Sequence, residues 1–268
     1  MAREHGAKRR PGGTGRVNIP GLSTMAALVG LWELAVRSAT VELEFLPAPS
    51  GIAGAVATLV ATGELFPPLL HTLRAALVGW VAAGALGIGL GVVLGLSRPA
   101  WRYSMASIEV VRAIPPVSLV PVALLLFGFS LRMELLVIVY AGAWTVLVST
   151  VEGVRNLRPE LADVGRMLRM SKATAVRKLV LPSAMPSIVV GLRLALSLSL
   201  VLAVVAEMVG NPRGLGNALI RAQQALQPEQ TFAYVVTIGL LGVVLNAGLR
   251  RMSARALPAL AAGRGELA

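Results

Sequence analysis

Residues that could carry out chemistry are scarce in this 268-residue chain. The sequence has no cysteine, which excludes disulfides, thiolate metal sites and thiol nucleophiles, and its only imidazoles are His5 and His71. Asp163 is the only aspartate, so a pair of aspartates for a two-metal transferase site cannot be built. No phosphate loop of the Gly-x-x-x-x-Gly-Lys-Ser/Thr type occurs, so the chain cannot hold ATP in that way. We expect no catalytic group, no metal site and no bound cofactor.

Four ionisable residues fall within apolar segments, where a charge is costly and usually has a function. Arg112 either extends its head group to the aqueous surface or pairs with a carboxylate. Glu207 either lies at the rim of its segment or faces a pathway. Together with Glu33 and Glu134, these residues could form the relay of an ion- or proton-coupled carrier, which stays an alternative function. A relay would need ionisable residues through the depth of the membrane, whereas these four lie near the ends of their segments. Their positions therefore argue against the carrier function.

The composition is that of an integral membrane protein. Hydrophobic residues make up 56% of the chain and charged residues 14%, with a mean hydropathy of +0.74, whereas soluble domains are about 25% charged. A bilayer core about 30 Å thick requires roughly 20 apolar residues per helix. The sequence therefore predicts an all-α protein with six transmembrane helices, at 21–38, 74–96, 108–129, 132–150, 187–209 and 231–249.

The distribution of basic residues predicts the orientation of these helices. With the N-terminus in the cytoplasm, 18 of the 25 Lys and Arg residues fall on the cytoplasmic side, where such residues are enriched in membrane proteins. Both termini are therefore expected inside, with the first helix retained rather than cleaved as a leader. The predicted organisation is a disordered basic cytoplasmic tail at 1–20, a six-helix domain at 21–250 and a cytoplasmic C-terminal tail at 251–268.

Two of the predicted helices have distinctive small or helix-breaking residues. Gly87, Gly91 and Gly95 recur every four residues, a spacing that lets two helices approach closely, although glycine is also common in transmembrane helices generally.

The prolines of the third predicted helix remove backbone donors, so that helix must bend or unwind, and a broken helix normally lines a cavity or packs on protein. We expect the translocation pathway to lie beside it, with hydrogen-bonded helix packing as the alternative for the serines. The candidate pathway residues are Arg112, Pro115, Pro116, Ser118, Ser197, Ser199 and Glu207.

The cytoplasmic loop at 152–182 is too long for a simple helical hairpin, and loops of this length are usually functional. Its apolar residues Leu157, Leu161, Val164 and Leu168 fall on one face of a helix. Ser171 can cap a second helix that is expected to end before Pro182. Such an amphipathic pair is suited to dock on another protein, with a position on the lipid surface as the alternative.

Several segments resemble the permease subunits of bacterial ATP-binding-cassette importers, in particular the nitrate, sulfonate and taurine group. They are FLPAPS after the first helix, RAIPPVSLVPVALLLFGFS in the third, the loop sequence that begins PELADVGRMLRM, and AEMVGNPRGLGNAL after the fifth. The resemblance implies a type I importer permease fold in the bacterial inner membrane and import of a small anionic solute. It also implies four kinds of partner: a cytoplasmic ATPase dimer that binds ATP and Mg²⁺, a second permease subunit, an external solute-binding protein and the lipid bilayer. We expect no nucleic-acid partner.

The same resemblance implies where the ATPase docks. In the family the loop has a Glu-Ala-Ala motif followed after three residues by glycine, and counted back from Leu181-Pro182 the motif falls on Asp163-Val164-Gly165 and the glycine on Arg169. The acidic group is kept, but the glycine is replaced. A turn that needs a left-handed backbone costs a non-glycine residue about 1 kcal/mol, so Arg169 implies either a different turn or tolerated strain. The residues implied in docking are Leu161, Asp163, Val164, Gly165, Leu168 and Arg169.

Overall fold

The computed structural model describes residues 19–38, 45–157 and 159–256, and in these ranges all regular secondary structure is helical. Residues 1–18 of the predicted basic tail and 257–268 of the predicted C-terminal tail lie outside the described residues. The helices are α1 (Ile19–Arg37), α2 (Pro49–Ala61), α3 (Phe66–Leu96), α4 (Arg98–Arg112), η1 (Pro116–Leu119), α5 (Val120–Phe127), α6 (Leu131–Arg155), α7 (Pro159–Met167), α8 (Lys172–Ala175), η2 (Val176–Val180), α9 (Leu181–Val209), α10 (Gly214–Gln224) and α11 (Pro228–Ala256).

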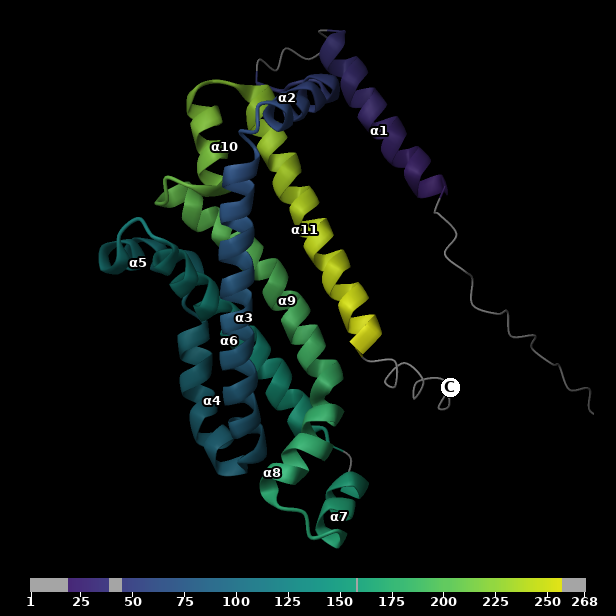
Figure 1. Cartoon of the computed structure of the whole chain (residues 1–268), viewed down its shortest axis with the longest axis vertical. Helices are drawn as coiled ribbons and strands as arrows, with labels where there is room; N and C mark the ends of the chain where they lie inside the picture. The colour runs from purple at the N-terminus through teal and green to yellow at the C-terminus, as the bar shows by residue number, and fades with distance from the viewer. Residues whose placement is uncertain (1–18, 39–44, 158, 257–268) are drawn as a thin grey trace, which may run out of the picture.

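Within the described residues, four helices are long and apolar enough to cross a membrane. They are α3, α6, α11 and the helix that runs continuously from Lys172 to Val209, and a bent pair made of α4 with η1 and α5 could serve as a fifth. The predicted all-helical membrane fold is therefore confirmed. The first predicted helix coincides with α1, which is not among these four, so the number six and the orientation stay predictions. In Figure 1, α2 and α10 lie at one end of the bundle and α7 and α8 at the other.

Helices α3 and α6 pack through a row of glycines on α3. A Cβ atom built on Gly87 would lie 2.7 Å from the backbone oxygen of Ala143, and one on Gly91 would lie 2.6 Å from Cβ of Thr150. Gly95 faces Val154 in the same way. Because side chains would overlap at these distances, the glycines allow the close approach that their spacing suggested.

Helix α9 packs on a different part of α6, again through residues with little or no side chain. A Cβ atom on Gly191 of α9 would lie 2.7 Å from Cβ of Ser149, and one on Gly153 of α6 would lie 2.9 Å from the backbone oxygen of Ala184. Helix α6 therefore packs on both α3 and α9, which also contact each other, and the three form the centre of the bundle (Figure 1).

The third predicted membrane helix is broken, as its prolines required. Helix α4 ends at Arg112, and the segment that begins at Pro116 continues at 74° to it. The hydroxyl of Tyr140, on α6, donates to the backbone oxygen of Val111. This bond adds to the one that the N–H of Ile114 donates to the same oxygen at 3.2 Å, and it ties the end of α4 to α6.

The second helix of the cytoplasmic loop does not end before Pro182, and that prediction was wrong. The helix that Ser171 caps passes through a π-helical turn at Val176–Val180 and continues as α9. A wider π turn accommodates a residue whose missing N–H would interrupt an ordinary α-helix. The hydroxyl of Ser183 donates to the backbone oxygen of Leu179 at 2.7 Å, which adds a bond beside the proline. The loop is thus joined rigidly to a membrane helix.

Close packing of α3 on α6 gives a testable prediction. We expect Gly91→Ala to lower the free energy of unfolding by about 1–3 kcal/mol, because the added methyl group would overlap Thr150 and the backbone of α6. Apparent thermal unfolding of the purified chain, followed by circular dichroism, measures the change.

Gly89→Ala is the matched control, because a Cβ atom at this position on the same helix meets nothing within 4 Å. It should be neutral or stabilising by up to about 1 kcal/mol, since alanine is the better helix former. Equal midpoints for the two variants would contradict the packing described here.

Candidate functional site

The loop at 152–182 presents part of its apolar surface outward and uses part for its own packing. Leu157 packs against the buried cluster of Val154, Val180, Ala184 and Ile188. Gly165 is buried, and a Cβ atom there would lie 3.0 Å from Cδ1 of Leu179. By contrast, Met167 is 82% exposed and Leu168 63% exposed.

The remaining residues implied in docking are spread over α7. Leu161 is half-buried, and Asp163 is exposed and forms an ion pair with Arg166 one turn later. The side chain of Val164 lies outside the described part of the structure. The apolar groups available to a partner therefore lie at the C-terminal end of α7.

Arg169 adopts the left-handed backbone conformation that a turn glycine would supply, with φ of 47°. Its N–H donates to the oxygen of Arg166 at 3.0 Å, and the N–H of Met170 donates to the oxygen of Gly165 at 3.1 Å. These bonds satisfy the last carbonyls of α7, as in glycine-terminated helices. The turn between the two loop helices is therefore kept, and the arginine adopts it at a cost in strain.

A cavity of about 470 Å³ lies between the bent segment, α6 and α9. Arg112 and Pro116 line it from the bent segment, and Tyr140 and Trp144 line it from α6. The guanidinium of Arg112 is 3.0 Å from Glu109 and 42% exposed, so this arginine both pairs with a carboxylate and stays accessible. The other residues that line the cavity are Ala141, Thr145, Val148, Ser149, Leu194, Leu198, Val201 and Leu202.

The other candidate pathway residues lie outside this cavity. Pro115 is exposed at the bend, and the hydroxyl of Ser118 donates to its backbone oxygen at 2.7 Å. Ser197 accepts from Nδ2 of Asn246, on α11, at 3.1 Å. Ser199 is fully buried and donates to the backbone oxygen of Ala195 on its own helix.

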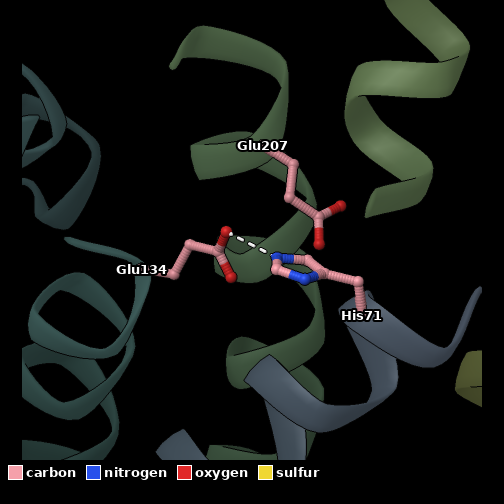
Figure 2. A group of neighbouring side chains, drawn as sticks. All are labelled: His71, Glu134 and Glu207. Carbon is pink, nitrogen blue, oxygen red and sulfur yellow. Dashed lines mark hydrogen bonds and ion pairs between the residues drawn. The ribbon is translucent and has the colours of Figure 1, made fainter. Parts of the chain in front are cut away.

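Glu207 belongs to a buried polar cluster at the end of the bundle opposite α7 and α8. His71 near the start of α3, Glu134 near the start of α6 and Glu207 near the end of α9 converge there (Figure 2). The Nε2 atom of His71 is 3.0 Å from Oε1 of Glu134, and both carboxylates are fully buried. Side chains from three membrane helices thus meet in one site.

Three polar groups hold the carboxylates of this cluster in place. The Thr72 hydroxyl and the N–H of Gly216 each donate to Oε2 of Glu207 at 2.9 Å, and the amide of Asn211 donates to Oε1 of Glu134. A Cβ atom on Gly214, where φ is 90°, would overlap the carboxyl of Glu207. Glycine is therefore required where α10 begins beside this carboxylate.

Sequence reasoning identified Glu207 and Glu134 separately but not the cluster. It noted His71 only as an imidazole, and it missed Thr72 and Asn211. One signal was available in the sequence. Glu134 lies near the start of its helix and Glu207 near the end of a helix that runs in the opposite direction, so both lie at the same end of the bundle.

Taken together, the apolar helix bundle, the cavity beside a broken helix and the helical loop with an exposed apolar end define a component of a membrane transport system. Comparison with known proteins gives the family. Residues 87–259 match the binding-protein-dependent transport system inner membrane component family, and the chain belongs to it. It is a permease component of the ATP-binding-cassette importer class and a multi-pass protein of the bacterial inner membrane.

Individual relatives are similar along most of their length. The chain is 27% identical to the putative aliphatic sulfonates transport permease protein SsuC of Bacillus subtilis (strain 168), over 93% of this chain and 91% of that protein. It is 31% identical to the protein of the same name in Escherichia coli (strain K12), over 80% and 82%. It is 26% identical to the taurine transport system permease protein TauC of Escherichia coli (strain K12), over 88% of each chain.

Solved structures show the same fold. A chain of the MetNI methionine ABC transporter in an inward-facing conformation matches with a TM-score of 0.62 at 18% identity, covering 69% of this chain and 93% of that one. A chain of an amino acid ABC transporter crystallised with histidines matches with a TM-score of 0.58 at 17% identity, over 74% and 94%. The predicted type I importer permease fold is thus confirmed.

The strained turn of the loop gives a second prediction. Arg169→Gly should raise the free energy of unfolding by about 1 kcal/mol, because glycine adopts a positive φ without steric cost. Thermal unfolding of the purified chain and slower amide hydrogen exchange over residues 159–180 would record the gain.

A second arginine-to-glycine change serves as the control for this test. Arg102 is exposed within α4 and has no positive φ, so Arg102→Gly should instead destabilise by about 1 kcal/mol. If both variants are destabilised equally, Arg169 does not occupy a strained turn.

Proposed function

We propose that this chain is the membrane-spanning subunit of an ATP-driven importer for a small organic or inorganic anion. The observation that carries the proposal is an accessible guanidinium, Arg112, in the cavity beside the broken helix of a family member. Proteins similar to the chain are named for transport of aliphatic sulfonates, nitrate and taurine. Sulfonate and nitrate groups each have three oxygens that share a negative charge, and an arginine guanidinium can bind two of these oxygens through two hydrogen bonds.

Arg112 would recognise the anion by exchanging partners. Its present partner, Glu109, lies one turn earlier on the same helix and is about half exposed, so the pair contributes little stability. An entering anion can take the place of Glu109 at the guanidinium, and Glu109 can turn to solvent. The aromatic and aliphatic remainder of the cavity would accommodate an alkyl chain without requiring further polar contacts.

Energy would reach the cavity through the continuous helix that begins in the cytoplasmic loop. Lys172–Val209 carries the loop at one end and includes Leu194 and Leu198, which line the cavity. A partner that moves the loop therefore moves a wall of the cavity as a rigid body, which is one of the established ways to switch between inward- and outward-facing states.

The proposal includes three protein partners. A cytoplasmic ATPase dimer holding ATP and Mg²⁺ would dock on the loop, with Met167 and Leu168 as apolar contacts and Asp163 opposite a basic residue. A second permease subunit would complete the pathway, and an external solute-binding protein would deliver the anion. The permease itself binds no nucleotide under this proposal.

The energy source provides a third prediction. In cells that import an aliphatic sulfonate through this system, ATP depletion with the proton gradient maintained should stop uptake, and a protonophore with ATP maintained should leave it nearly unchanged. Leu168→Asp should abolish both uptake and co-purification of the ATPase, because it places a carboxylate in an apolar interface.

Gln223→Asp is the control for the loop variant, because it adds the same exposed charge at the opposite end of the molecule. It should leave co-purification of the ATPase intact. Uptake that follows the proton gradient instead of ATP would support an ion-coupled carrier and overturn the proposal.

The proposed anion contact gives a fourth prediction. Arg112→Gln should lower uptake of the sulfonate at least about tenfold, since a charge-assisted hydrogen bond contributes roughly 1.5–3 kcal/mol. Arg102→Gln removes an exposed arginine of the same helix outside the cavity and should keep wild-type uptake. Uptake in proteoliposomes with the ATPase and binding protein present measures both, and equal rates would exclude Arg112 as the anion contact.

A further inference from the structure

We propose that His71, Glu134 and Glu207 bind one divalent transition-metal ion at the end of the bundle opposite the cytoplasmic loop. Each residue offers one ligand atom, and these atoms all lie within 4.8 Å of one another. The three side chains converge from α3, α6 and α9, and Figure 2 shows the imidazole between the two carboxylates. The site lies apart from the cavity that contains Arg112.

Two buried carboxylate oxygens are placed where a cation could bind them. Glu134 and Glu207 are both 0% exposed, and Oε2 of Glu134 and Oε1 of Glu207 have no hydrogen-bond partner. Among the described residues, His71 is the only basic side chain within ion-pair distance of either carboxylate. When both carboxyls are ionised, an imidazolium offsets at most one of the two negative charges, whereas a divalent ion offsets both. Burying an unpaired charge is costly, so this difference favours a metal ion.

The groups around the cluster orient the ligands as second-layer partners do in metal sites. Thr72 and the N–H of Gly216 hold Oε2 of Glu207, which leaves Oε1 without a hydrogen-bond partner. The Thr72 hydroxyl in turn accepts the N–H of Leu215 at 2.9 Å. Asn211 holds Glu134 from the segment before α10. The carboxylates are thus fixed before an ion enters.

The ligand set indicates the kind of metal. One imidazole nitrogen with carboxylate oxygens suits Zn²⁺ or Mn²⁺, whereas Ca²⁺ and Mg²⁺ prefer oxygen ligands alone. Ligands at about 2.0–2.2 Å from a tetrahedral ion lie roughly 3.4 Å apart, so the ligand atoms, which lie within 4.8 Å of one another, must move together by up to about 1.4 Å to bind it. In the metal-bound form, Nε2 of His71 would bind the ion instead of its present partner Glu134.

An ion could reach the site from the surface. Asn211 lines a hollow of about 250 Å³ together with Phe129, Met208, Val209, Gly210, Pro212 and Asn217. The side chain of His71 is 18% exposed. Because the ligands lie near the ends of their helices, an ion would not have to enter the middle of the membrane.

The test is Zn²⁺ binding by the full chain purified without a histidine tag. After EDTA treatment and removal of the chelator, Zn²⁺ alone is titrated, and bound zinc per chain and the thermal midpoint are measured. We expect about one Zn²⁺ per chain and a raised midpoint. Glu134→Gln and Glu207→Gln keep the side-chain shape and should each weaken binding at least about tenfold, as should His71→Asn.

Glu64→Gln is the matched control, because Glu64 is exposed just before α3, at the end of the bundle where the cluster lies. It should bind zinc as the wild type does. X-ray absorption of the zinc-loaded wild type, which requires no variant to fold, should show one imidazole with oxygen ligands. The proposal fails if the wild type binds no zinc and its midpoint is unchanged, if the Glu134→Gln, Glu207→Gln double variant retains the zinc, or if coordination is by oxygen alone.

Discussion

The structure depends on the close packing of α6 between α3 and α9. At Gly87 and Gly91 on one side and Gly191 on the other, the neighbouring helix lies so near that an added carbon would overlap it. In a membrane, where lipid is as apolar as the side chains, such close contact is a main source of helix association. This packing also fixes the relative positions of the three helices. The geometry of the cavity that contains Arg112 and of the His71, Glu134 and Glu207 cluster therefore depends on it.

Those two sites lie in different surroundings and suit different tasks. The cavity beside the bend contains an arginine that is partly exposed and weakly paired, which allows it to change partners. The cluster at the other site is buried, with each carboxylate held by donors from a neighbouring helix or loop. A ligand that passes through requires the first kind of site, and an ion that stays bound and joins helices requires the second.

Prolines interrupt the backbone hydrogen bonding of two membrane helices, and the two helices respond differently. Pro115 and Pro116 follow the end of α4 at a 74° break beside the cavity, where Tyr140 donates a hydrogen bond to the backbone oxygen of Val111. Pro182 lies in a helix that continues, because the π turn before it accommodates the missing N–H. One proline segment therefore lies at a break beside the cavity, while the other lies in a continuous helix that joins the loop at 152–182 to the wall of that cavity.

The apolar helices, the glycine row of α3, the broken third helix, the Ser171 cap and the family could all be predicted from the amino-acid sequence. Each of these depends on residue types at short spacing, which local periodicity and backbone chemistry reveal. The folded structure was needed to show that the helix passes through Pro182, that Ser197 faces α11 and that His71, Glu134 and Glu207 meet. The last three residues are more than 60 positions apart in sequence. Their contact depends on how far each helix is displaced and rotated against the next, and that is set by packing between helices.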